Sequence, residues 1–197
     1  MRKLIIIMLL AMLLLMGCSP QFKMVPLNDK FSDPKEPLAY MGIGNRISNM
    51  TAGKGLCIGG LGFYISPVVK IDRVTSEVIG LGIHINHVAQ EVSDGYNPIE
   101  SLVFLTNTGE RIEWNFEYLD SDYNVGAWDT YSQSYSTQYK EQALAEIDIE
   151  GYLKLCEASS IECKVIGGDL SHTYESSDIA KEFLPNLRTF RDEYLTP

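Results

Sequence analysis

The 197-residue sequence is poor in the residues that build catalytic and metal sites. It holds three histidines, four cysteines and two tryptophans, and it lacks both the Cys-x-x-Cys and the His-Glu-x-x-His spacing of zinc sites. The Gly-x-Ser-x-Gly pattern of many hydrolases is also absent, and the glycine-rich stretch 53–62 fits neither phosphate-binding nor dinucleotide-binding patterns. These absences predict a protein that is not an enzyme and that binds no cofactor.

Positive charge is also scarce. Lysine and arginine number 16 against 26 acidic residues, which gives a formal charge of −10. A surface of this sign is repelled by phosphate backbones, so nucleic acid is not expected as a partner. The remaining composition, with 45% hydrophobic and 21% charged residues, is typical of an ordinary globular domain.

No apolar run is long enough for a permanent membrane span. The longest run, Leu4–Met16, follows the basic start Met1-Arg2-Lys3. As a helix it would rise about 20 Å, which is short of the roughly 30 Å hydrocarbon core of a bilayer. Residues 1–17 are therefore predicted to be a cleaved signal peptide.

The end of this run resembles a known signal. Leu15-Met16-Gly17-Cys18 is similar to the lipobox of bacterial lipoproteins, in which the cysteine becomes the acylated first residue of the mature chain. The resemblance implies that Cys18 carries palmitate or a similar lipid and anchors the protein to the bacterial envelope. Ser19 stands where an aspartate would signal inner-membrane retention, which favours the outer membrane, facing the periplasm. The alternative is that Cys18 is an ordinary thiol after a secretory signal cleaved elsewhere.

The mature chain divides into a tether and one domain. Pro20, Pro26, Pro34 and Pro37 are half of the prolines in the sequence, and they predict an extended, solvated tether over residues 18–39. A single domain is expected over residues 40–197. The patterns there indicate an α+β fold, with an antiparallel sheet, a short helix and a C-terminal helix or kinked helix pair.

Alternating hydrophobicity predicts most of the strands, and a helical period predicts the helices. The expected strands are Val78–Ala89, Leu102–Thr106, Arg111–Tyr118, Glu141–Ile149 and Ile161–Ile166. Helices are expected over Glu150–Ser159 and from Ile179 to Tyr194, where Pro185 either kinks the helix or begins a second one.

The remaining cysteines allow two interpretations. Cys156 and Cys163 are near enough in sequence for a disulfide between the short helix and the next strand, in an oxidising compartment. Alternatively, these two residues and Cys57 are small buried apolar side chains.

A weak metal motif occurs at Asp120, Asp122 and Asn124, where alternating oxygen ligands resemble the start of a calcium loop. The glycine is displaced by one position, and Tyr131 stands where the closing glutamate should be. No metal is therefore expected at these residues, which are interpreted as a solvated acidic turn.

The histidines give little support to catalysis. His84 and His87 are three apart in a predicted strand, so they should point to opposite faces and not share a metal. His172 has Asp169 and Ser171 nearby in sequence, but such proximity does not arrange a catalytic triad. An envelope hydrolase that uses His84 or His172 remains the alternative function.

An aromatic segment supplies the candidate binding site. Tyrosine and tryptophan lie among Ser, Asp, Asn and Gln in a predicted polar loop over residues 120–138, a composition typical of binding loops. The candidate residues are Tyr123, Trp128, Tyr131 and Tyr135. Several of these rings would alternatively cover the domain's own core. The sequence thus predicts a membrane-anchored, non-catalytic binding or structural module for an envelope protein or glycan, or else a subunit of a larger envelope assembly; it gives no oligomeric state.

Overall fold

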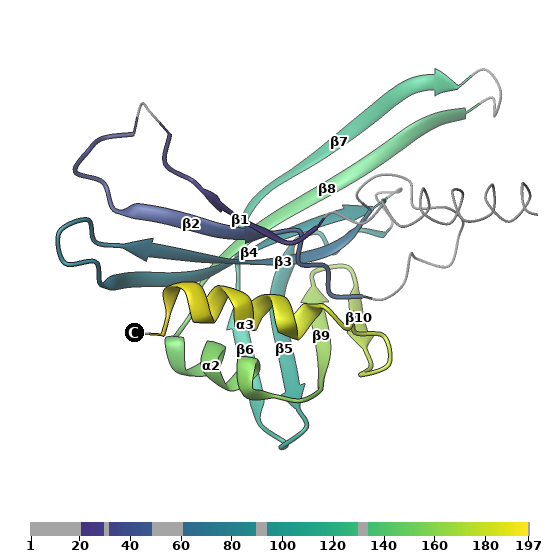
Figure 1. The fold of residues 1–197 in the computed structure, drawn as a ribbon. Coiled ribbons are helices and arrows are strands. Elements are labelled where there is room, and N and C mark those ends of the chain that lie inside the picture. Colours follow the sequence, from purple (N-terminus) through teal and green to yellow (C-terminus); the bar gives the residue numbers. More distant parts are fainter. Residues whose placement is uncertain (1–20, 30–31, 49–60, 90–93, 130–133, 197) are drawn as a thin grey trace, which may run out of the picture.

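The protein folds into two antiparallel sheets and two described helices (Figure 1). The computed structural model describes residues 21–29, 32–48, 61–89, 94–129 and 134–196. The larger sheet has six strands in the order β1-β2-β3-β4-β8-β7, and the smaller has four in the order β10-β9-β5-β6. The elements are β1 Lys23–Pro26, β2 Leu38–Ile43, β3 Gly62–Ile71, β4 Val78–Ala89, β5 Ile99–Thr106, β6 Arg111–Asn115, β7 Glu117–Asp129, β8 Ser134–Glu146, α2 Ile149–Glu157, β9 Ile161–Gly167, β10 Ser171–Tyr174 and α3 Phe183–Tyr194.

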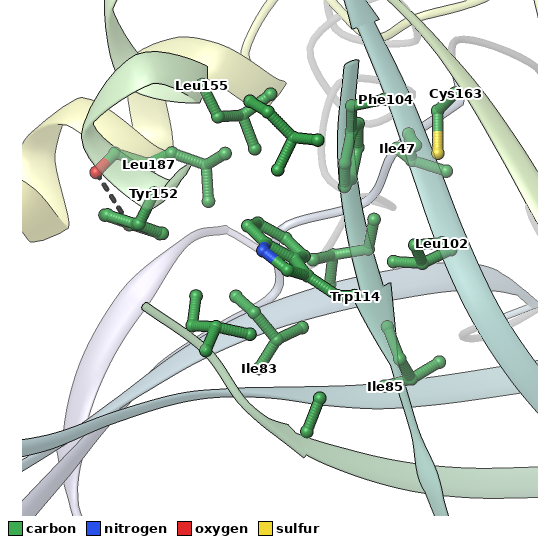
Figure 2. Close-up of a cluster of buried hydrophobic side chains, with 14 of the residues drawn as sticks. Ile47, Ile83, Ile85, Leu102, Phe104, Trp114, Tyr152, Leu155, Cys163 and Leu187 are labelled. Carbon is green, nitrogen blue, oxygen red and sulfur yellow. Dashed lines mark hydrogen bonds between the residues drawn. The ribbon is translucent and has the colours of Figure 1, made fainter. Parts of the chain in front are cut away.

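The core lies between the sheets and the helices. On β4, the buried residues Leu81, Ile83 and Ile85 alternate with partly exposed neighbours, as the sequence predicts for a strand with one covered face. The smaller sheet contributes Phe104 and Trp114, whose rings meet edge to face with centroids 5.1 Å apart. Figure 2 shows these rings between the larger sheet and the helices. The α+β class expected from the sequence is confirmed.

The strand predicted over Arg111–Tyr118 is divided between the two sheets. β6 ends at Asn115 in the smaller sheet, and β7 begins at Glu117 in the larger one. Between them, the backbone N–H of Phe116 donates to Glu100 O at 2.8 Å. The alternation continues through the crossing because both halves are strands, so the pattern alone could not show that the chain changes sheets.

The helices pack against each other beside the sheets. α2 begins after Asp148, whose carboxylate accepts the N–H of Gly151 at 2.5 Å as a side-chain cap. The buried hydroxyl of Tyr152 donates to Leu187 O at 3.0 Å and joins α2 to α3, as the dashed line in Figure 2 shows. None of the helices in the described ranges is long and apolar enough to cross a membrane.

The C-terminal helix starts later than its apolar stripe suggests. α3 begins at Phe183, so Pro185 lies in its first turn, where the missing N–H of proline costs no helical hydrogen bond. Ile179 instead forms a β-bridge with Ser48, and Ala180 N donates to Ile47 O at 2.7 Å. The predicted helical start at Ile179 is therefore wrong, because sheet pairing holds that segment extended.

The N-terminal stretch also differs from the prediction. Lys23–Pro26 forms β1, in register with residues 40–43 of β2, and β2 itself begins at Leu38. Part of the segment expected as a tether over residues 18–39 is thus an edge of the larger sheet. Pro26 is compatible with this position because it ends an edge strand, where its missing N–H leaves no ladder bond unmade.

The disulfide that the sequence allows between Cys156 and Cys163 is not formed. Cys156 on α2 and Cys163 on β9 are both buried free thiols. Burial raises the pKa of the Cys156 thiol to about 12 and also raises the pKa of Cys163. Both residues therefore act as small apolar core side chains, the alternative that the sequence left open; Cys57 lies outside the described residues.

This arrangement predicts slow thiol chemistry in the folded protein. In a Cys57→Ser background, iodoacetamide at pH 8 should label Cys156 and Cys163 at least about tenfold more slowly than in urea, because neither thiolate forms readily in the core. Mass spectrometry of the alkylated, non-reduced protein measures both rates. A bridged peptide joining the two cysteines would contradict the structure.

Candidate functional site

The most prominent feature of the surface is the long hairpin of β7 and β8. Each strand has 13 residues, but β4 pairs with β8 only from Tyr139 to Glu146. Residues 134–138 of β8 therefore pair, among the described strands, with β7 alone. At about 3.4 Å per residue, this part extends roughly 17 Å past the paired end of β4. Figure 1 shows the two strands rising away from the rest of the domain.

The hairpin replaces the polar loop predicted over residues 120–138. β7 and β8 are in antiparallel register from Glu117↔Leu144 to Asp129↔Ser134, with irregularities after Tyr118 and after Val125. The sequence prediction failed because it searched for apolar alternation, which marks strands with one face on a core. Strands that leave the core have no such requirement.

The structure distributes the candidate aromatic residues along this hairpin. Tyr123 of β7 is the register partner of Tyr139, and Trp128 is opposite Tyr135 of β8. Tyr131 lies outside the described residues. Three of the four predicted binding residues thus belong to paired strands. The strand register fixes the backbone positions of these three residues relative to one another.

A buried carboxylate holds the base of the hairpin. Glu141 of β8 is 1% exposed and lies on the core-facing side of the strand, in the same alternation as Ala143 and Ala145. His87 Nδ1 of β4 lies 3.0 Å from Glu141 Oε2. The backbone N–H groups of Tyr96 and Asn97 donate to the same carboxylate at 2.8 and 2.7 Å. Three donors from two separate segments therefore meet on one side chain.

The charge of Glu141 follows from these contacts. Burial raises the pKa of the carboxyl group, but the hydrogen bonds from His87, Tyr96 and Asn97 outweigh burial and leave the pKa below its ordinary value. The group is therefore ionised at neutral pH. An ionised carboxylate accepts all of these hydrogen bonds, which is the condition for burying it at tolerable cost.

Aromatic rings and a shallow groove surround this carboxylate. The centroid of the His87 ring is 5.6 Å from that of Phe63 and 5.1 Å from that of Tyr96. The Tyr139 hydroxyl donates to Asn97 Oδ1 and joins β8 to the turn that leads into β5. Beside it, a groove of about 340 Å³ is lined by Asn97, Pro98, Ser121 and Tyr139.

His84 and His87 lie on opposite faces of β4, as their spacing predicts. His84 Nε2 lies 3.2 Å from Gln142 Oε1, whereas His87 meets Glu141, the preceding residue of β8, so the two rings are on opposite faces. Burial lowers the pKa of His84, and the bond to Gln142 partly opposes this shift. His172, on β10, is exposed and packs edge to face on Tyr174 with centroids 4.5 Å apart.

Sequence reasoning missed the Glu141–His87 pair, whose members are 54 positions apart. The available signal was a single glutamate in the apolar alternation of β8, where it precedes Ala143 and Ala145. An acid at a core position needs buried donors. The sequence does not show, however, which strand or turn supplies them.

The candidate metal ligands also lie on the hairpin. Asp120, Asp122 and Asn124 occupy alternate positions of β7, opposite Gln142, Lys140 and Gln138. The segment is thus a paired strand and not the acidic turn expected from the sequence. In the described ranges, no group of three or more His, Cys, Asp or Glu side chains is placed to hold a metal ion.

A second hollow, of about 430 Å³, lies between β6 and the start of α2. Its residues are largely charged, and Lys154 lies 2.8 Å from Glu150 and 3.8 Å from Glu110. Ion pairs of this exposed kind are typical of a solvated surface and contribute little to stability.

No protein-family model, curated protein or solved structure matches this chain.

The buried carboxylate predicts a pH-dependent stability. Glu141→Gln should lower the free energy of unfolding by about 2 kcal/mol at pH 7, because the amide turns an NH₂ group toward donors that need an acceptor. Since the folded pKa of Glu141 is lowered, its contribution is complete above the unfolded pKa and is lost as pH falls through the folded pKa. The free energies of unfolding of the native protein and of Glu141→Gln should therefore become equal at acidic pH.

Urea unfolding between pH 3 and 7 measures this effect. Glu146→Gln is a matched control, because Glu146 is an exposed acid on the same strand. The control should change stability by less than about 0.5 kcal/mol. Equal stability of Glu141→Gln and the native protein at pH 7 would contradict the role assigned to Glu141.

Proposed function

We propose that this protein is a lipid-anchored lipoprotein of the bacterial cell envelope, whose domain binds an envelope component through the β7–β8 hairpin and catalyses no reaction. The resemblance of Leu15-Met16-Gly17-Cys18 to a lipobox supports the anchor. Ser19 favours the outer membrane by the same resemblance. A lipid-anchored domain is held at the membrane, so its binding surface acts on partners that are also confined to the envelope.

The observation that carries the binding role is the extension of the hairpin past the sheet. Core packing does not require strands that continue beyond their neighbours, because apolar surface is buried where the two layers lie over each other. The extension nevertheless contains Tyr135 and Trp128, and such residues provide large contact area at low entropic cost. A hairpin of this composition is suited to contact with a partner protein or glycan.

The base of the hairpin supports the same function. Glu141 and Tyr139 both belong to β8, and both bind the turn at Tyr96 and Asn97. This attachment fixes the direction in which the hairpin leaves the domain. Binding residues on a rigid support lose less conformational entropy when a partner is captured.

The anchor predicts a defined processing defect. Cys18→Ser should abolish incorporation of labelled palmitate and leave either unprocessed precursor or a product released from membranes, because the acylated atom is removed. Cys57→Ser is the matched control and should retain the lipid. Persistent labelling of the Cys18→Ser protein would contradict the proposed anchor.

The hairpin predicts a site-specific contact in the living cell. A photoreactive phenylalanine analogue at Trp128 should cross-link to an envelope component, because this position is near the outer end of the hairpin. The same analogue at Val74, which is 91% exposed in the β3–β4 connection, is the control and should give no such product. Identical products at both positions would indicate nonspecific contact and reject the hairpin as the binding site.

A further inference from the structure

The edges of the two sheets differ greatly in length. β1 and β10 have four residues each and β6 has five, whereas β7 has 13. Among the described strands, β7 is paired only with β8. Its other side therefore carries a row of backbone N–H and C=O groups directed away from the sheet, and such a row can pair with an added strand.

The charge of this edge limits what can pair with it. β7 carries Glu117, Asp120, Asp122 and Asp129 and has neither lysine nor arginine. Glu117, Asp120 and Asp122 are exposed. A second β7 placed alongside would bring these acids close to one another, and like charges on neighbouring strands are destabilising. A second copy of this chain is thus disfavoured, and a strand rich in lysine or arginine is favoured.

We propose that β7 captures a basic, extended segment of a partner protein by strand addition. This inference rests on the binding function proposed above and specifies the partner as a protein segment. Backbone hydrogen bonds to the edge supply affinity that depends little on sequence, and the acids of β7 select for positive charge.

The groove at the base of the hairpin adds a side-chain preference. Ser121 of β7 lines it together with Asn97, Pro98 and Tyr139, and Ser121 is the register partner of Glu141. The groove is therefore on the core-facing side of the hairpin. An added strand would lie about 4.8 Å from β7, with every second side chain on this same side. One apolar side chain of the partner then reaches the groove beside Ser121.

Designed peptides test the proposal on the lipidated protein in nanodiscs of zwitterionic lipid, with empty nanodiscs as background. The first peptide has ten residues of alternating lysine and threonine, with one central threonine replaced by leucine, so that the leucine can face the groove while the lysines share the face of Glu117, Asp120 and Asp122. The second replaces every lysine with glutamate. The third keeps the lysines and replaces the two threonines nearest the leucine with proline, which removes backbone donors without changing the charge. Binding is measured at low salt by calorimetry.

The lysine peptide should bind, and the other two should bind at least about tenfold more weakly. Hydrogen exchange of the β7 amides should slow at least about tenfold on addition of the lysine peptide, because those facing the added strand become paired. Equal affinity for the proline peptide, or unchanged exchange of β7, would show charge attraction alone and overturn strand addition.

Charge reversal on the protein supplies the matched variants. The double variant Glu117→Lys/Asp120→Lys should bind the lysine peptide at least about tenfold more weakly than the native protein. The control Glu157→Lys/Glu193→Lys makes the same charge change at exposed helical positions and should change the affinity less than about threefold. Equal loss in both double variants would also overturn the proposal. A Trp128 cross-link to a glycan, with no lysine-peptide binding, would reject strand addition while retaining the proposed binding function.

Discussion

The buried carboxylate of Glu141 is the contact on which the arrangement of the hairpin depends. It accepts hydrogen bonds from β4 through His87 and from the turn at Tyr96 and Asn97. That turn leads into β5, so one side chain connects the larger sheet to the first strand of the smaller one. Removing its charge would leave these three donors with an inadequate acceptor at the place where the two sheets meet.

This attachment separates the hairpin into two parts with different physical constraints. From Tyr139 to Glu146, β8 lies between β4 and β7, and its core-facing residues are buried. Beyond Tyr139, β8 pairs with β7 alone among the described strands. The first part joins the hairpin to the core, and the second is the part that we propose contacts a partner.

Much of the fold could be predicted where a strand has one buried face. The bounds of Val78–Ala89 agree with β4 because Leu81, Ile83 and Ile85 alternate with less buried residues. Local patterns could not show the change of sheet at Phe116, which depends on a hydrogen bond to Glu100. They also did not reveal the hairpin, because the many Ser, Asp, Asn and Gln residues of 120–138 are typical of a loop as well.

The sequence groups the candidate binding residues in one segment but does not give the form of that segment. The aromatic composition around Trp128 is typical of binding loops, and a loop and a hairpin offer a partner different chemistry. A loop offers side chains, whereas β7 adds a row of directed backbone groups. In the strand addition that we propose, the acids on this edge have two effects, because they oppose pairing between copies and favour a basic strand. The proposal therefore assigns both the specificity against self-association and the preference for a basic partner to the same residues, Glu117, Asp120 and Asp122.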